Sequence, residues 1–301
     1  MLVPTPCVGT SQLCRIWEGK NEKLDYENDD GDVLTVFMFS PLCAAEEKPL
    51  APGERTTVAE VDREDVDRPT ASFDVAFLSQ YIWRGLELSK DSLVIQPSAT
   101  VAYKGFSVNV WGNLDTDVYA GPNKGQSKWN ETDLTVAYDH SFGPVGVGLG
   151  YIYYALDSTE DTQEFYLSVG GDVILAPTLT AYWDVDEYPG WYFNLGISHS
   201  FDLPHEITLD LAGSVGYYIS ENDSIVDYDD NLNATTSRYS NFQDGLVSVG
   251  LTIPFLKYFT ATPIIAYSFP LSSADDNMLR AASLSNSAAH LFGGVTLSLA
   301  F

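Results

Sequence analysis

The sequence predicts an all-β fold: a closed antiparallel 12-stranded transmembrane β-barrel of the outer-membrane type. From Ala71 onward, apolar residues recur with a period of two, which indicates strands with one apolar face. Twelve such segments follow one another, most of them about ten residues long, the length of a tilted strand that crosses a bilayer. The connections between them alternate between short and long, as they do in outer-membrane barrels.

The alternation of side chains justifies each of the twelve segments. In the segment 145–154, for example, Val147 and Leu149 share one face, whereas Gly146 and Gly148 share the other. The same pattern predicts strands at 73–78, 95–103, 106–110, 133–139, 145–154, 164–172, 179–186, 191–201, 207–217, 244–253, 259–269 and 290–301.

The connections predict how the barrel is oriented. The short ones are expected at 104–105, 143–144, 174–177, 202–205 and 254–257, and the longer ones at 85–92, 115–130, 157–162, 186–190, 221–241 and 270–288. Outer-membrane barrels place tight turns on the periplasmic side and long loops outside. We therefore expect the cell outer membrane of a Gram-negative bacterium, with both termini periplasmic.

The first seventy residues differ from the rest in composition. Residues 1–45 form an N-terminal extension that contains a residual signal-peptide-like segment, 34–45, an apolar run ending in small residues with a cleavage point after Ala45. The acidic stretch Glu27–Asp32 stands where a basic region would precede a signal, so a short buried strand is the alternative. Residues 46–70 are polar and contain prolines, which predicts a flexible periplasmic linker, and 71–301 is the transmembrane β-barrel.

A soluble β-sandwich would also show alternating strands. The second face of a sandwich would carry many Lys, Glu and Arg residues, whereas here it is mostly Gly, Ser, Thr, Asn and Asp. Aromatic residues also gather near both ends of the strands, as at the two interfaces of a bilayer. The set near the long loops is Tyr81, Trp83, Trp111, Tyr151, Tyr153, Trp183, Tyr188, Trp191, Tyr217, Tyr218 and Tyr267, and the set near the short turns is Tyr103, Phe106, Tyr138, Phe142, Phe201, Phe255, Tyr258 and Phe259.

Acidic residues dominate the polar face, which should point into the barrel. The formal net charge of −27 argues against a nucleic-acid partner. The expected pore-lining residues are Asp74, Arg84, Asp133, Asp139, Glu164, Asp172, Asp184, Asp186, Asp210 and Asp244. An acidic lumen concentrates cations and repels anions. The sequence thus predicts a porin-like channel for passive passage of small solutes or ions that prefers cations. A non-conducting structural or adhesive outer-membrane barrel is the alternative.

Arg84 is notable because basic residues are scarce. It could pair with lumen carboxylates and set a constriction, or it could anchor the backbone of the first long loop. It belongs to the stretch 79–117, "SQYIWRGLELSKDSLVIQPSATVAYKGFSVNVWGNLDTD", in which Tyr81-Ile82-Trp83-Arg84-Gly85 ends the first strand and Trp111-Gly112 lies in a later one. This stretch resembles the start of the TorF-like porin family of proteobacterial outer-membrane β-barrels. The resemblance implies an outer-membrane porin, although other 12-stranded channel families share the architecture.

We expect no enzyme, cofactor or metal. Outer-membrane phospholipases use a Ser-His-Asn arrangement on the lipid-facing surface, and His140 and His199 have outward parity, but neither lies near a Gly-x-Ser-x-Gly motif. Asp227, Asp229 and Asp230 have oxygen-ligand spacing for calcium, but the stretch lacks the glycine and the terminal glutamate of a helix-loop-helix site. A solvated loop is the favoured interpretation.

The chain ends on an alternating strand with Leu297, Leu299 and Phe301 on one face. This ending resembles the assembly signal that the bacterial barrel-assembly machinery reads. The expected partners are therefore outer-membrane lipid and lipopolysaccharide, the barrel-assembly machinery during insertion, and small solutes or cations.

Overall fold

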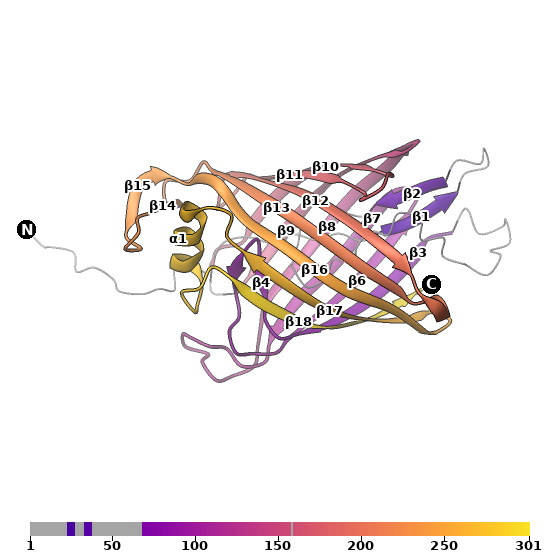
Figure 1. Ribbon diagram of the computed structural model, residues 1–301, viewed down its shortest axis with the longest axis horizontal. Coiled ribbons are helices and arrows are strands. Elements are labelled where there is room, and N and C mark those ends of the chain that lie inside the picture. The colour runs from indigo at the N-terminus through magenta and orange to yellow at the C-terminus, as the bar shows by residue number, and fades with distance from the viewer. Residues whose placement is uncertain (1–22, 28–32, 38–67, 158) are drawn as a thin grey trace, which may run out of the picture.

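Twelve antiparallel strands close into one barrel, which confirms the predicted fold class (Figure 1). The computed structural model describes residues 23–27, 33–37, 68–157 and 159–301. The barrel strands are β3 (Thr70–Leu78), β6 (Val94–Tyr103), β7 (Phe106–Asp115), β8 (Lys128–Phe142), β9 (Val145–Leu156), β10 (Thr162–Gly171), β11 (Thr178–Asp184), β12 (Gly190–Asp202), β13 (Thr208–Ser220), β16 (Ser240–Leu256), β17 (Phe259–Phe269) and β18 (His290–Ala300).

Neighbours in the chain are neighbours in the sheet, and the last strand closes against the first. β18 pairs with β3 from Gly294 opposite Leu78 to Ala300 opposite Ser72. Backbone hydrogen bonds between Ala71 and Phe301 continue this seam past the end of β18. Closure matters because backbone N–H and C=O groups have no water to bind in a bilayer, so a spanning sheet can leave no open edge.

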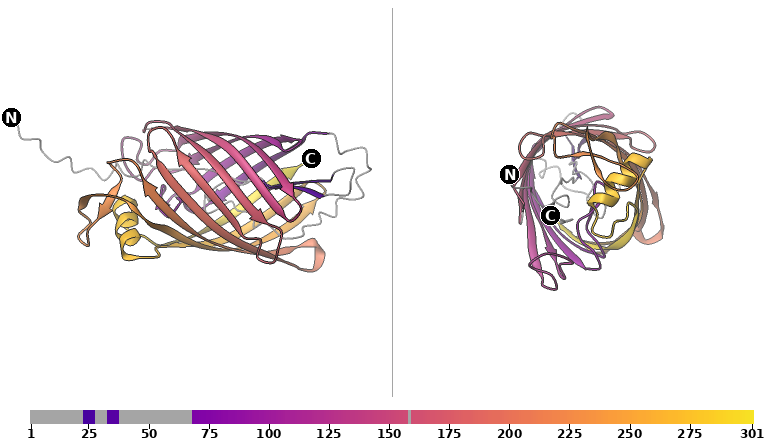
Figure 2. Two further views of the ribbon diagram at one scale, coloured as in Figure 1. Left: turned by 90° about the horizontal axis from the view of Figure 1, so that it is seen from above. Right: turned by 90° about the vertical axis from the view of Figure 1, so that its left-hand side faces the viewer.

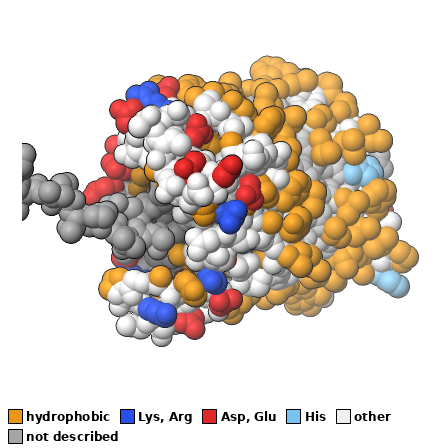
Figure 3. Space-filling model, turned by 60° about the vertical axis from the view of Figure 1, so that its left-hand side comes forward, with side chains coloured by type: hydrophobic (Ala, Val, Ile, Leu, Met, Phe, Trp, Pro, Cys, Tyr) orange, Lys and Arg blue, Asp and Glu red, His pale blue; other side chains and the backbone are white. Residues whose placement is uncertain are grey.

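The period of two separates an apolar outer face from a polar inner face. Outward Val101, Leu149 and Leu167 are 56 %, 53 % and 52 % exposed, whereas inward Gln96 and Ser168 are fully buried. Apolar side chains cover the barrel wall, and charged side chains gather at one end (Figure 3). The wall therefore has the composition expected of a surface in contact with acyl chains. None of the helices in the described ranges is long and apolar enough to span a membrane.

The two ends of the barrel differ, and we name them by their connections. The turn end carries the short connections, such as Lys104-Gly105, whose two residues have φ of 51° and 82° as a tight hairpin turn requires. The loop end carries the long ones, which hold the hairpin β4 (Ile82–Trp83) and β5 (Leu86–Glu87), the hairpin β14 (Val226–Tyr228) and β15 (Ala234–Arg238), and the helix α1 (Ser273–Ala282). Helix α1 lies in the opening at the loop end (Figure 2).

The N-terminal region adds one described hairpin. Strands β1 (Lys23–Glu27) and β2 (Val33–Phe37) pair with each other, and β2 lies beside β8 and β9. The remainder of the signal-like segment after residue 37, the expected cleavage point after Ala45, and residues 46–67 of the expected linker lie outside the described residues.

The aromatic set expected near the long loops needs a correction. Tyr81, Trp83, Trp111, Tyr188 and Tyr218 are each at most 8 % exposed and belong to the buried cluster rather than to an outer girdle. Tyr81 and Trp83 lie on a loop that folds inward, whereas Trp111 and Tyr218 lie on the inner face of their strands. The set near the short turns does lie on the outside, with Phe106 and Phe142 more than 60 % exposed.

Candidate functional site in the barrel lumen

Eight of the ten expected pore-lining residues lie inside the barrel. Seven are carboxylates on inward strand positions and one is Arg84; the carboxylates are Asp74, Asp133, Asp139, Glu164, Asp184, Asp210 and Asp244. Asp172 and Asp186 are exposed instead. They were expected on the inner face by parity, but Asp172 lies one residue beyond the end of β10 and Asp186 two residues beyond the end of β11, where strand alternation no longer applies.

The first long connection folds into the barrel as a short hairpin. Strand β4 pairs with β5 through Ile82 opposite Glu87 and Trp83 opposite Leu86. The two residues between them, Arg84 and Gly85, have φ of 43° and 82°. Two successive positive φ values define a type I′ turn, which suits a two-residue hairpin. The sequence Arg-Gly therefore places a guanidinium at the tip of this hairpin.

The tip of the hairpin reaches the far wall of the lumen. Arg84 donates from Nη1 and Nη2 to the two carboxylate oxygens of Glu164 on β10, both at 2.9 Å. Its guanidinium carbon also lies 4.7 Å from the ring centroid of Tyr182 on β11 and 4.1 Å from that of Tyr192 on β12. In the closed strand order, β11 is six strands from β3 in either direction. The hairpin thus leaves the wall at β3 and crosses the lumen to the opposite side.

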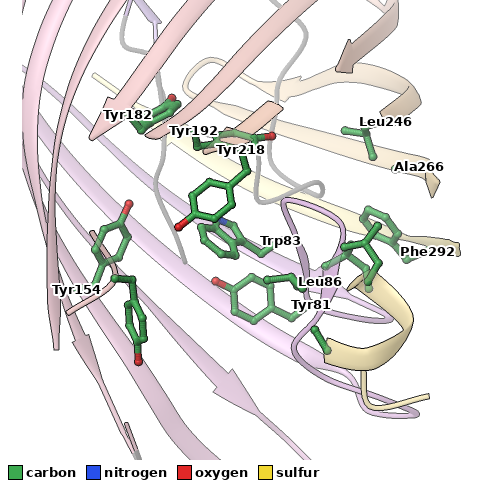
Figure 4. Packing of buried hydrophobic residues seen from close by; sticks show 14 of the residues in the cluster. Tyr81, Trp83, Leu86, Tyr154, Tyr182, Tyr192, Tyr218, Leu246, Ala266 and Phe292 are labelled. Carbon is green, nitrogen blue, oxygen red and sulfur yellow. The ribbon is translucent and has the colours of Figure 1, made fainter. Parts of the chain in front are cut away.

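A network of tyrosines and carboxylates surrounds this ion pair, and Figure 4 shows three of the tyrosines, Tyr154, Tyr182 and Tyr192, near Trp83. The hydroxyl of Tyr154 donates to Glu164 at 2.8 Å, and the hydroxyl of Tyr192 donates to Asp244 at 3.0 Å. Arg84 and Glu164 are 2 % and 0 % exposed. Buried ions are tolerated when they are paired and hydrogen-bonded, whereas an isolated one is costly. The arrangement fixes the hairpin tip at one position in the lumen.

Helix α1 covers the hairpin from the loop end. A Cβ atom added to Gly85 would lie 2.9 Å from Leu279 of α1 and 2.9 Å from the Cβ of Asp244 on β16. The helix begins at a capping box, in which the Ser272 side chain accepts from the backbone of Asp275 and the Asp275 side chain accepts from the backbone of Ser272. Glycine is therefore the one residue type that fits at position 85, between α1 and the barrel wall, without displacing either.

Glu87 joins the base of the hairpin to the helix and to the last strand. Its carboxylate accepts from Gln80 Nε2 at 3.0 Å and from the backbone N–H of Ser285 at 2.6 Å, and it lies 3.7 Å from Nδ1 of His290. Gln243 donates to the backbone carbonyl of Arg84 at 3.2 Å. Sequence reasoning missed Glu87, Gln243 and α1. The capping box and the Arg-Gly turn were the signals that could have revealed these local structures.

The turn-end half of the lumen is lined differently. Asp74, Asp139 and Asp210 come from three separate strands and each lies within five residues of the turn end of its strand. Asp210 accepts from the hydroxyls of Ser200 at 2.5 Å and Thr252 at 2.8 Å. Neither carboxylate oxygen of Asp139 is hydrogen-bonded within the described part of the chain. Asp74, which is partly exposed, is the carboxylate of this half that is placed to attract mobile cations.

The acidic loop between β14 and β15 is folded on itself. The backbone N–H groups of Asn231 and Asn233 both donate to Oδ1 of Asp229 at 2.9 Å. These bonds, chiefly the one from Asn233, lower the pKa of Asp229 below its ordinary value. Asp230 accepts from Asn277 of α1 at 3.2 Å. In the described ranges, no group of three or more His, Cys, Asp or Glu residues is arranged to hold a metal ion.

The two outward histidines lie among aromatic rings. The ring centroid of His140 is 4.6 Å from that of Phe142, and the same distance separates His199 from Phe201. Within the residues that the structure describes, neither imidazole is hydrogen-bonded to a serine, and Nδ1 of His199 is buried without a partner. The arrangement shown is that of aromatic side chains near a bilayer interface.

The fold and the lumen together define a porin-like β-barrel of the outer-membrane type. The chain belongs to the family Gcw_chp, described as "bacterial protein of unknown function", whose match covers residues 64–236. That span is more than half of the chain and takes in the strands from β3 to β13 together with the inward hairpin. No curated protein matches this chain in sequence.

Several solved structures of outer-membrane channels resemble the barrel. The NanC porin is 10 % identical over 76 % of this chain and 98 % of its own, with a TM-score of 0.49. An outer-membrane channel from Pseudomonas putida F1 is 9 % identical over 77 % of this chain and 94 % of its own, with a TM-score of 0.45. An anion-selective porin from Comamonas acidovorans is 9 % identical over 78 % of this chain and 99 % of its own, with a TM-score of 0.31.

Proposed function

We propose that the protein is an outer-membrane channel for passive passage of small solutes or ions, and that it prefers cations. The observation that carries the proposal is the charge of the inner wall. The turn-end halves of the described barrel strands contain no Lys or Arg, whereas Asp74, Asp139 and Asp210 face the interior there. Carboxylates in a narrow lumen with a low-dielectric wall raise the local cation concentration and exclude anions.

The proposal includes an orientation and a family relationship. We place the turn end, with both ends of the barrel domain, on the periplasmic side and the long loops outside, next to lipopolysaccharide. The aromatic-x-Arg-Gly corner at Tyr81 to Gly85 supports a TorF-like porin. The outward Leu297 and the terminal Phe301, 43 % and 69 % exposed, are proposed to be read by the barrel-assembly machinery.

A second candidate function is a non-conducting structural or adhesive barrel. The observation that favours it is the loop-end half of the lumen, where the β4–β5 hairpin and α1 pack into the buried cluster. A barrel filled at this level conducts only if the filling moves. Conductance separates the two functions directly.

The test is the reversal potential of the refolded protein in a planar bilayer under a gradient of KCl. The wild type should favour potassium over chloride, and Asp74→Asn should reduce that preference because it removes a partly exposed carboxylate from the inner wall. Glu160→Gln is the matched control, since it removes one carboxylate from an exposed loop. A wild-type preference for chloride, or equal effects of the two substitutions, would overturn the assignment of the inner wall as the selective element.

A further inference from the structure

The β4–β5 hairpin crosses the lumen without being part of its wall. The two strands pair only with each other and form a separate two-stranded sheet. The barrel is closed by β3 pairing with β6 on one side and with β18 on the other, and both ladders end at Leu78. The hairpin can therefore leave its position without breaking any hydrogen bond between the barrel strands.

The contacts of the hairpin differ between its tip and its base. At the tip, Arg84 pairs with the carboxylate of Glu164, and its guanidinium lies over the rings of Tyr182 and Tyr192 across the lumen. At the base, β5 packs against α1, and Leu86 is 1 % exposed in the apolar cluster that also contains Leu279. When the tip detaches, water can solvate the separated charged groups. If the base detached, its apolar side chains would be exposed to water, which is unfavourable. The tip is thus the part of the hairpin that can detach and return.

Arg84 also sets the charge of the lumen at this level. It is the one Lys or Arg among the buried side chains of the described residues, and Glu164, Asp184 and Asp244 are buried in the same half of the barrel. With the tip in place, the guanidinium offsets part of this negative charge. When the tip moves away, the guanidinium no longer offsets the charge of the carboxylates on the wall. The opened state should therefore prefer cations more strongly than the closed state.

We infer that the β4–β5 hairpin is a plug that closes the lumen, that the Arg84–Glu164 ion pair is its latch, and that Arg84 is a residue that determines both opening and charge selectivity. The inference rests on the proposed channel function. Opening consists of the tip swinging away from β10, β11 and β12 while the base stays packed against α1.

Single-channel recording in planar bilayers tests the plug. A variant lacking residues 82–87 should conduct continuously, with a time-averaged conductance at least tenfold above the wild type and a stronger preference for potassium. Arg84→Gln and Glu164→Gln should each increase the time spent open, and Arg84→Lys should lie between Arg84→Gln and the wild type, because lysine keeps the charge but not the paired hydrogen bonds. Arg280→Gln is the matched control, since it removes an arginine from the exposed face of α1, where it pairs with Asp276.

The outcomes separate the plug from the channel. If the wild type already conducts as much as the variant that lacks the hairpin, the plug is refuted and the channel function stands. Folding of each variant is checked by its electrophoretic mobility before and after heating in detergent. If none of the folded variants conducts, the channel function is refuted, and the plug is refuted with it. Should Arg84→Gln not fold, the deletion and Glu164→Gln carry the same test.

Discussion

The fit of Gly85 under helix α1 leads to a quantitative prediction for Gly85→Ala. Gly85 has a φ of +82°, and an added Cβ would lie 2.9 Å from both the Cβ of Asp244 and a methyl group of Leu279. The methyl group belongs to a flexible side chain and can move, whereas the Cβ of Asp244 is fixed on strand β16. The substitution should therefore push the hairpin tip away from the wall and loosen the Arg84 latch.

Gly121→Ala provides a matched control for the magnitude. Gly121 has a φ of +81°, and an added Cβ would meet nothing within 4 Å. Both substitutions carry the cost of a left-handed backbone for alanine, about 1 kcal/mol. Only Gly85→Ala adds overpacking, which costs about 1–3 kcal/mol. The difference between the two variants is therefore about 1–3 kcal/mol in the equilibrium for hairpin release, or roughly 5- to 150-fold.

Limited trypsin digestion in detergent, followed by mass spectrometry, measures this equilibrium. Arg84 is 2 % exposed, so cleavage after it requires release of the tip. When opening and closing are fast, the cleavage rate follows the population of the open form. Cleavage after Arg84 should be faster in Gly85→Ala than in Gly121→Ala by the factor given above, while cleavage after the exposed Arg238 should stay the same. Equal rates after Arg84 in the two variants would refute the packing argument.

Two further predictions concern the wall and the loops. Leu167→Arg places a charge on the outer face of β10 and should lower the free energy of unfolding in lipid vesicles by about 2–4 kcal/mol, as measured by urea titration. Leu271→Arg, in a loop, should change this free energy little. Similar losses in the two variants would contradict a lipid-facing wall. Because hydrogen bonds lower the pKa of Asp229, its support of the β14–β15 hairpin is complete above the unfolded pKa of about 4 and is lost as the pH falls through the lowered folded value. Protection of the Asn233 amide against hydrogen exchange should fall over that range in the wild type but not in Asp229→Asn.

The wall of the barrel could be predicted from the sequence because its two faces meet different surroundings. Each strand alternates apolar and polar residues, so a local sequence pattern predicts both where the strand lies and which side chains point outward. The prediction was incomplete for β7, for example, which was expected at 106–110 but extends from Phe106 to Asp115. The next outward position after Val110 is Gly112, which has no apolar side chain of its own to continue the pattern. The ring of Trp129 on the neighbouring strand β8 covers Gly112 and makes the outer face apolar there.

The plug could not be predicted in the same way, because its burial depends on residues distant in sequence. Arg84 meets Glu164 eighty positions later, and Glu87 meets Ser285 198 positions later. Trp83 is an aromatic residue near a strand end, as the residues of an aromatic girdle are. No local sequence pattern distinguishes a ring that faces lipid from one that faces the lumen. The same limit explains Asp172 and Asp186, since parity assigns a side only while the strand continues.

The charge of the latch itself argues for a plug that opens. Replacing a buried ion pair by well-packed apolar residues is often neutral or stabilising, so stability alone does not account for a buried arginine and glutamate inside this barrel. An apolar tip would expose apolar surface to water each time it left the far wall, which opposes opening. Arg84 and Glu164 instead lose their pairing but regain hydration when the tip detaches, and the two effects offset each other. A charged tip on an apolar base thus lets one hairpin stay attached to α1 while the lumen beside it opens to cations.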